Sequence, residues 1–268
     1  MEIDPEFPQL HPPQEPARTG PGLKWVILVL VAIIAVICIL AVVVYFTNEN
    51  QMGVKVVRME GTLETGDVSG TDTVGSEVVG GELRDAADDP MVEAIVLRVN
   101  SPGGSPAAAE EIIGDLDYAK SKKPVVVSMG DMATSAAYYV SAHADRIYAD
   151  PDTFTGGIGV IWTFSDISRW MNTEGYNVTT VKSGDMKDMG SSSHALTDEE
   201  RDYAQQIVNE SFDEFINDIT SQRAIARSEI EDGRVFRGAD ALKINLVDQI
   251  GNLNDAIEGA KELAATRR

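Results

Sequence analysis

Two residues of this chain, a serine and a lysine, lie in segments whose composition suits chemistry. Ser135 follows an apolar run and opens a predicted helix, which would set its hydroxyl beside helix N-terminal amides that lack intrahelical partners. Lys187 lies in a polar, glycine-containing loop after a predicted strand at residues 178–181. A serine hydroxyl becomes a nucleophile when a neighbouring base takes its proton, and a neutral lysine amine can be that base. The pair therefore indicates acyl-transfer chemistry by a Ser-Lys dyad.

The three histidines of the chain are weaker candidates than Lys187 for the base that takes the Ser135 proton. His11 lies in the N-terminal tail, and His143 lies eight residues along the same predicted helix as Ser135, about 12 Å away by helical rise. His194 remains an alternative base, because spacing alone does not remove it. A lysine is therefore the preferred partner of the serine.

A lysine can act as a base only when it is neutral. Its ordinary pKa of about 10.4 must therefore be lowered, which burial in an apolar pocket achieves. Asp185 and Asp188 flank Lys187 and would raise its pKa if they were close, so their side chains must point away. Considered singly, Ser135 is better explained as a helix cap and Lys187 as a solvated loop lysine.

A glycine-containing turn at residues 100–106 offers amides for a negatively charged oxygen. It follows a predicted strand and precedes a helix with Ser105 at the N-cap and Pro106 at the first helical position. Gly103 and Gly104 leave their backbone N–H groups uncovered, and such amides can form an oxyanion hole. Taken alone, the segment is better explained as an ordinary strand-to-helix turn. It lacks the Gly-Lys-Ser/Thr ending of a phosphate-binding loop.

Strand-like and helix-like segments alternate along the chain after residue 53. This alternation predicts an α/β fold in which crossover helices connect the strands of a parallel sheet. A capping box at residues 197–200 opens a long amphipathic helix whose apolar stripe suits packing on a core or a neighbouring subunit. The predicted strands are 54–59, 94–99, 124–128, 146–149 and 246–247, and the predicted helices are 78–87, 106–119, 135–142 and 254–264.

An apolar run near the N-terminus predicts a membrane anchor. Residues 26–46 are 21 consecutive residues without a charge, glycine or proline, and a helix of that length matches the bilayer's hydrocarbon thickness. We therefore predict a transmembrane helix at 25–46, preceded by a disordered, proline-rich tail at 1–24. A cleaved signal peptide is the alternative, although its apolar core is usually shorter. Arg18 and Lys24 favour a cytoplasmic N-terminus, so the remainder would be extracytoplasmic at the cell membrane.

The overall charge argues against one class of partner. Acidic residues number 43 against 22 basic residues, a net charge of −21, which would repel the phosphates of nucleic acid. The single cysteine, Cys38, lies inside the apolar run, so no disulfide within the chain and no cluster of zinc-binding thiolates is predicted. We expect no metal and no cofactor.

An ordered set of short motifs resembles the signal peptide peptidase A family of membrane-bound Ser-Lys proteases, within the Clp protease and crotonase superfamily. The likeness covers roughly residues 54–260 and is carried by the whole order of motifs, since any one of them is weak. The motifs are Asn-Ser-Pro-Gly-Gly at 100–104, the block at 133–139, Asp-Arg-Ile-Tyr-Ala at 145–149, Thr-Gly-Gly-Ile-Gly-Val at 155–160, Lys-Ser-Gly at 182–184 with Lys187 and Asp188, Thr-Asp-Glu-Glu-Arg at 197–201, Gly-Arg-Val-Phe-Arg-Gly at 233–238 and Leu-Val-Asp at 246–248.

The resemblance implies a role for particular residues. It makes Ser135 the nucleophile, Lys187 the general base, and the amides of Gly103 or Gly104 and of Ala136 the oxyanion donors. It also implies a homo-oligomeric ring in which adjacent chains supply the serine and the lysine of one site. The 52 residues between Ser135 and Lys187 suit the short, single-domain form of the family.

Two positions depart from the usual pattern of that family. Ala136 and Ala137 follow the serine where the family usually has two glycines, which adds methyl groups beside the site. Gly157 stands where the family usually has a serine whose hydroxyl helps to orient the lysine. Thr155 or Ser183 could supply that hydroxyl instead.

These observations predict a Clp protease/crotonase-like domain at 47–268 that acts as a membrane-anchored serine endopeptidase. Its expected substrates are apolar peptides, such as remnant signal peptides. Two alternatives stay open: a crotonase-like acyl-CoA enzyme that uses the same glycine amides, and a catalytically weak or silent scaffold that assembles at the membrane.

Overall fold

The computed structural model describes residues 22–47 and 53–267, so most of the predicted tail at 1–24 lies outside the described residues. The chain divides into two compact units, Met1–Asn50 and Gln51–Arg268. The described part of the first unit is one helix of 25 residues, α1 (Leu23–Thr47). None of the helices in the described parts of the chain has the length and apolar character needed to cross a membrane. Of the anchor predicted at 25–46, side chains are described as far as Leu40.

The second unit is built on a mostly parallel sheet, as predicted. Its main strands lie in the spatial order β1-β4-β5-β6-β9, and every neighbouring pair in that path is parallel. Two further strands, β7 and β8, continue from the end of β5, and β8 is antiparallel to β7. The strands are β1 (Val54–Glu60), β4 (Ala94–Ser101), β5 (Val125–Thr134), β6 (Arg146–Ala149), β7 (Phe154–Gly156), β8 (Val235–Arg237) and β9 (Gln249–Ile250), with a separate pair β2 (Thr62–Glu64) and β3 (Thr73–Gly75).

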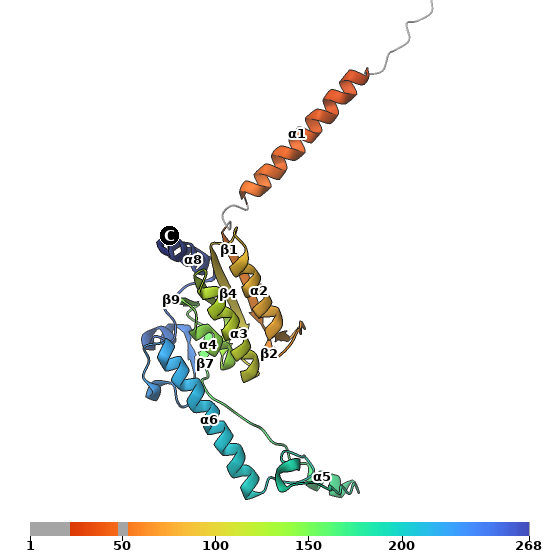
Figure 1. Cartoon of the computed structure of the whole chain (residues 1–268), viewed down its shortest axis with the longest axis vertical. Coiled ribbons are helices and arrows are strands. Elements are labelled where there is room, and N and C mark those ends of the chain that lie inside the picture. Colours follow the sequence, from red (N-terminus) through yellow and green to blue (C-terminus); the bar gives the residue numbers. More distant parts are fainter. Residues whose placement is uncertain (1–21, 48–52, 268) are drawn as a thin grey trace, which may run out of the picture. The chain divides into compact units, whose positions relative to one another are not determined.

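Helices cover both faces of this sheet because alternate residues of its strands are apolar on both sides. Ile95 and Leu97 of β4 belong to the larger core, together with helices on one face. Ala94 and Val96 belong to a second core with the C-terminal helix. In Figure 1, α2 and α3 lie on one side of the strands and α8 lies on the other. These helices are α2 (Ser76–Asp88), α3 (Pro106–Lys120), α4 (Ala136–Ala142), α7 (Gly238–Ala241) and α8 (Leu253–Arg267).

The end of β5 is the part of the sheet that positions the candidate site. The strand begins between β4 and β6, and its last residues, Met132–Thr134, pair with Phe154–Gly156 of β7. It runs six residues beyond the predicted end at residue 128 and stops directly before Ser135. Helix α4 then starts at Ala136, so Ser135 lies on a sharp strand-to-helix turn.

Residues 161–197 form an extension whose side chains are mostly exposed. It carries the short helix α5 (Ser168–Thr173) and the one-turn helix η2 (Asp185–Asp188), and it leads into α6 (Asp198–Gln222). Figure 1 shows α5 beyond the end of α6 that is remote from the sheet, while the other end of α6 reaches the core. Phe215, Ile216 and Ile219 near that second end are buried.

Most predicted elements form, with two exceptions. The strand predicted at 178–181 is wrong: these residues form no strand, and Val181 is 95% exposed, because no neighbouring strand pairs with them in the described chain. Leu246 and Val247 are buried as expected of a strand, yet the strand itself begins two residues later, at Gln249. The capping box at Thr197 forms as predicted, with Thr197 and Glu200 bonding each other's backbone N–H groups.

Candidate active site

Ser135 is held in a backbone conformation that L-residues rarely adopt. Its φ is +54° and its ψ is −127°, and apart from Asn245 it is the single non-glycine residue with positive φ in the described chain. Such a conformation costs roughly 1–3 kcal/mol and persists only where the surroundings enforce it. The Ser135 side chain does not cap helix α4, and its hydroxyl has no hydrogen-bond partner among the described residues. The simpler interpretation of Ser135 as a helix cap is therefore wrong.

The turn around Ser135 is fixed by hydrogen bonds to two neighbouring segments. The Ser135 N–H donates to the Gly156 carbonyl at 2.8 Å, and the Thr134 hydroxyl donates to the Pro102 carbonyl at 3.0 Å. Gly103, with φ +103°, packs so closely that an added Cβ would lie 2.9 Å from both Ser135 Cβ and the Ala136 nitrogen. These contacts explain why the strained conformation is retained and why residue 103 must be glycine.

Two amides beside Ser135 are free to bind a negatively charged oxygen. The Gly103 N–H donates to the buried Ser101 hydroxyl at 3.1 Å, so it is already used. The amides of Gly104 and Ala136 have no partner in the described structure, and Ala136 begins helix α4, where no intrahelical acceptor is available. Of the two predicted glycine donors, the geometry therefore favours Gly104.

Strand β2 holds the Gly104 turn in place. The Leu63 N–H donates to the Gly103 carbonyl and the Ser105 N–H donates to the Leu63 carbonyl, both at 2.8 Å. An added Cβ at Gly104 would lie 2.3 Å from the Leu63 carbonyl oxygen. The Ser105 hydroxyl caps α3 by accepting from the Ala108 N–H, as predicted. The turn therefore caps helix α3 and also fixes the position of the free Gly104 amide.

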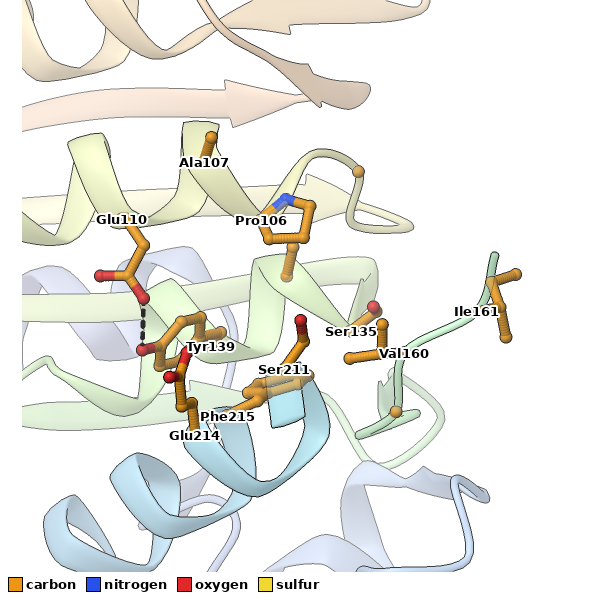
Figure 2. Close-up of a pocket in the computed structure, with 13 residues that line it drawn as sticks. Pro106, Ala107, Glu110, Ser135, Tyr139, Val160, Ile161, Ser211, Glu214 and Phe215 are labelled. Atoms are coloured by element: carbon orange, nitrogen blue, oxygen red, sulfur yellow. Dashed lines mark hydrogen bonds between the residues drawn. The ribbon is translucent and has the colours of Figure 1, made fainter. Parts of the chain in front are cut away.

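Two pockets meet at Ser135. The first has a volume of about 260 Å³ and is shown in Figure 2. The second, which Ser135 also lines, has a volume of about 780 Å³. Gly104 and residues 159–161 also line both pockets, so a peptide bond at Ser135 would have two adjoining spaces for its flanking side chains. The first pocket is lined by Gly104, Pro106, Ala107, Glu110, Ser135, Ala136, Tyr139, Gly159, Val160, Ile161, Ser211, Glu214 and Phe215.

Lys187 does not line either pocket. It lies on η2 in the extension, its side chain is exposed, and it has no side-chain partner among the described residues. Asp188 is held by Lys182 at 2.6 Å and by His194 at 3.2 Å. The hydrogen bond from Lys182, followed by that from His194, lowers the pKa of the Asp188 carboxyl below its usual value. One chain therefore does not bring the predicted base to the predicted nucleophile.

Neither described histidine takes the place of the lysine at Ser135. His194 Nδ1 donates to the Ala195 carbonyl, and that bond, together with the contact to Asp188, raises the pKa of His194. His143 is buried and its Nε2 lies 2.9 Å from Asp218 Oδ2. Both imidazoles thus have carboxylate partners away from the serine.

The hydroxyls predicted to orient the lysine lie in different surroundings. Thr155 is fully buried in β7, and its hydroxyl donates to the Ala133 carbonyl at 2.8 Å. Ser183 is exposed in the extension with Lys187. Gly157 has φ +61°, and a Cβ there would make ordinary contacts of 3.4 Å or more. A side chain would fit at residue 157 but would adopt a left-handed backbone conformation.

The far wall of the first pocket is not predicted from the sequence. Glu110, Tyr139 and Glu214 come from three helices, α3, α4 and α6, which converge only in the folded chain. A weak signal was present, because Ala107 and Glu110, three residues apart, share one face of α3. No group of acidic, histidine or cysteine residues able to hold a metal ion occurs in the described parts of the chain.

The parallel sheet, the serine turn and the free amides are consistent with a Clp protease/crotonase-like α/β domain. The model of peptidase family S49 matches residues 117–267, more than half of the chain. The chain belongs to peptidase family S49, which confirms the resemblance predicted from the order of its motifs.

Relatives of known name agree with this membership. "Putative protease MJ0651" of Methanocaldococcus jannaschii is 37% identical over 68% of this chain and 60% of its own length. "Protease 4" of Haemophilus influenzae is 34% identical over 80% of this chain and 35% of its own length. "Putative signal peptide peptidase SppA" of Enterococcus faecium is 36% identical over 68% of this chain and 54% of its own length. The chain thus matches between about a third and three fifths of the length of these relatives.

Proposed function

We propose that this protein is a membrane-anchored serine endopeptidase that cleaves apolar peptides, such as remnant signal peptides, with Ser135 as its nucleophile. The observation that carries the proposal is the Ser135 turn itself. A strained serine with an uncommitted hydroxyl lies beside two free amides, at the junction of two pockets. Enzymes retain such strain where it positions a reacting group.

The chemistry follows from the positions of these groups. The Ser135 hydroxyl attacks the carbonyl carbon of the scissile peptide bond as the base takes its proton. The amides of Gly104 and Ala136 stabilise the resulting oxyanion, and the base then gives the proton to the departing amine. Water, activated by the same base, cleaves the acyl-enzyme and regenerates the serine.

The base in this proposal is Lys187 of an adjacent subunit in a homo-oligomeric ring. Two observations support this arrangement. Lys187 lies outside both pockets of its own chain, and the extension that carries it exposes large apolar side chains such as Ile161, Trp170 and Val181. Exposed apolar surface of this kind suits contact with another chain. That contact would also bury the lysine, and burial is what lowers a lysine pKa.

The anchor proposed for this enzyme is the apolar run at 26–46. Its support is the absence of charge along 21 residues and the exposure of apolar side chains on α1, including Leu28, Ile34 and Ile39. An anchor would keep the site close to lipid, where apolar peptides accumulate. We propose that residues 54–268 lie on the extracytoplasmic side of the cell membrane.

Labelling with a fluorophosphonate probe tests the proposal most directly. The full chain in detergent micelles should react at one serine and should hydrolyse a fluorogenic apolar peptide. Ser135→Ala should abolish both signals, whereas Ser121→Ala, which removes an exposed serine at the end of α3, should change neither. An assembled wild-type protein that neither reacts nor cleaves would favour the silent scaffold. Binding and turnover of an acyl-CoA would favour the crotonase-like alternative.

A further inference from the structure

The first pocket beside Ser135 combines apolar walls with an acidic end. Pro106, Ala107 and Phe215 contribute apolar surface. Glu110 on α3 and Glu214 on α6 contribute carboxylates from opposite sides. Figure 2 shows both carboxylates on the side of the pocket away from Ser135, with the Tyr139 ring between them. A side chain that entered beside the serine would therefore pass apolar surface before it reached two carboxylates.

Within the described structure, neither carboxylate has a cationic partner. Glu110 accepts one hydrogen bond, from the Tyr139 hydroxyl at 2.7 Å, and Glu214 has no partner in the described residues. The lining of the pocket contains no lysine, arginine or histidine. Burial, followed by the hydrogen bond to Glu110, raises the pKa of Tyr139, so this hydroxyl remains a neutral donor. The negative charge at this end of the pocket is not neutralised by the chain.

The second pocket provides a contrast within the same site. It also contains two acidic residues, Glu231 and Asp232. Glu231 pairs with Arg227 at 3.3 Å, and Asp232 accepts from Arg234 Nε at 2.6 Å. The acids of the second pocket therefore have arginine partners, and those of the first do not.

We propose that the first pocket selects a lysine or arginine side chain next to the scissile bond of the substrate. The methylene stem would lie against Pro106, Ala107 and Phe215, and the charged end would bind between Glu110 and Glu214. This inference rests on the proposed peptidase function and narrows its substrate to apolar peptides that carry a basic residue at the cut. The physical reason is electrostatic: Glu110 and Glu214 are exposed and unpaired with any cation in the described structure, so a basic side chain gains charge-assisted hydrogen bonds there that an apolar side chain lacks. The net charge of −21 would also attract such a substrate.

Paired peptides test the selection. One series carries lysine beside the scissile bond and the other carries norleucine, which keeps the stem and removes the charge. The variable residue is placed on either side of the bond in turn. For the full-length wild-type protein in detergent, we expect kcat/KM for the better lysine peptide to exceed that for its norleucine partner by about 10-fold to 100-fold. Added salt should reduce the preference.

Single substitutions assign the preference to the carboxylates. Glu214→Gln should lower kcat/KM for the lysine peptide by about tenfold and leave the norleucine peptide within about twofold. Glu110→Gln, whose amide oxygen can still accept from Tyr139, should act in the same direction, and the double variant should remove the preference. Glu82→Gln, at an exposed position of α2 outside both pockets, is the matched control and should change neither peptide.

The experiments distinguish failure of the proposed selection from failure of the proposed peptidase function. If wild type cleaves norleucine peptides as well as lysine peptides, and Glu214→Gln leaves the ratio unchanged, then selection of a basic residue is wrong while the peptidase function stands. If no peptide is cleaved and the fluorophosphonate probe labels wild type no faster than Ser135→Ala, the peptidase function and the selection fail together.

Discussion

The turn at Ser135 and the segment that carries Lys187 are built in opposite ways. Ser135 lies between two buried residues, Thr134 and Ala136, and its N–H is bonded to the neighbouring strand β7. Lys187 lies on a single helical turn with no buried residue, in an extension that is mostly exposed. The core of the chain therefore fixes the position of Ser135, the proposed nucleophile. It does not fix Lys187, the proposed base, because the extension buries too little apolar surface to hold itself against the sheet.

One chain by itself therefore holds the proposed nucleophile and both proposed oxyanion donors, but it does not bring the proposed base to them.

Loss of Lys187 should inactivate an assembly made of that variant alone. Co-assembly with the Ser135→Ala variant should restore part of the activity. Lys187→Ala should lower kcat by about 10²-fold to 10⁴-fold, which is the usual contribution of a general base. If adjacent subunits share a site, equal co-assembly of Lys187→Ala with inactive Ser135→Ala should recover about a quarter of wild-type activity, because one site in four receives both intact residues. Peptide hydrolysis by co-expressed, co-purified chains measures this.

Assemblies of each variant alone, at the same oligomer size, are the controls for the mixing experiment. An inactive mixture would mean that serine and lysine come from one chain. Full activity of Lys187→Ala would remove the lysine from the mechanism and make His194 the next candidate base.

The free amide at Gly104 should be the next most sensitive feature. Gly104→Ala should lower kcat by about 10²-fold to 10³-fold, because the new Cβ would press on the Leu63 backbone and move one oxyanion donor. Gly114→Ala, in the middle of α3 with no atom near its added Cβ, is the control and should leave kcat unchanged. Equal activity of the two variants would show that the Gly104 amide is not a donor in the reaction.

Removal of the Thr155 hydroxyl in the core and of the Ser183 hydroxyl in the extension should affect stability differently. Thr155→Val should reduce the free energy of unfolding by about 1 kcal/mol, because it removes a buried hydrogen bond to Ala133, whereas Ser183→Ala should not. If either hydroxyl orients Lys187, its loss should shift the acidic limb of the pH–rate profile of kcat, because that limb reports the protonation of the base. Profiles that coincide with wild type for both variants would exclude both residues from that role.

Asp218 should give the smallest effect, on stability in acid. Partial burial alone would raise its pKa, but the hydrogen bond from His143 Nε2 at 2.9 Å lowers it below the usual value. A carboxylate with a lowered folded-state pKa stabilises the protein above its unfolded pKa, and this stability is lost as the pH falls through the folded pKa. Asp218→Asn should therefore be less stable than wild type at pH 6.

The difference between Asp218→Asn and wild type should shrink as the pH falls below about 4. Urea unfolding followed by far-UV circular dichroism measures it, with Asp202→Asn, at an exposed position of the same helix, as a control. A difference that is constant from pH 6 to pH 3 would contradict the assignment.

The sequence alone determined the order of elements, the parallel sheet and the family. Those features depend on local periodicity, on glycine and capping residues, and on motifs such as the turns at 100–104 and 133–139. It also predicted Ser135 as a candidate nucleophile, because a serine between a buried strand and an alanine-rich helix is visible locally. The strand predicted at 178–181 failed because a β-branched, apolar pattern forms a strand only when another strand is available to pair with it.

Only the folded chain shows which backbone amides and carboxylates beside Ser135 already have hydrogen-bond or ionic partners and which do not. Gly103 and Gly104 are indistinguishable in the sequence, and the buried Ser101 hydroxyl that occupies the Gly103 amide separates them. The acidic end of the first pocket was also invisible, since Glu110 and Glu214 are 104 positions apart in the numbered chain. Both distinctions arise from contacts between segments remote in sequence, and such contacts exist only after the sheet and its helices have packed.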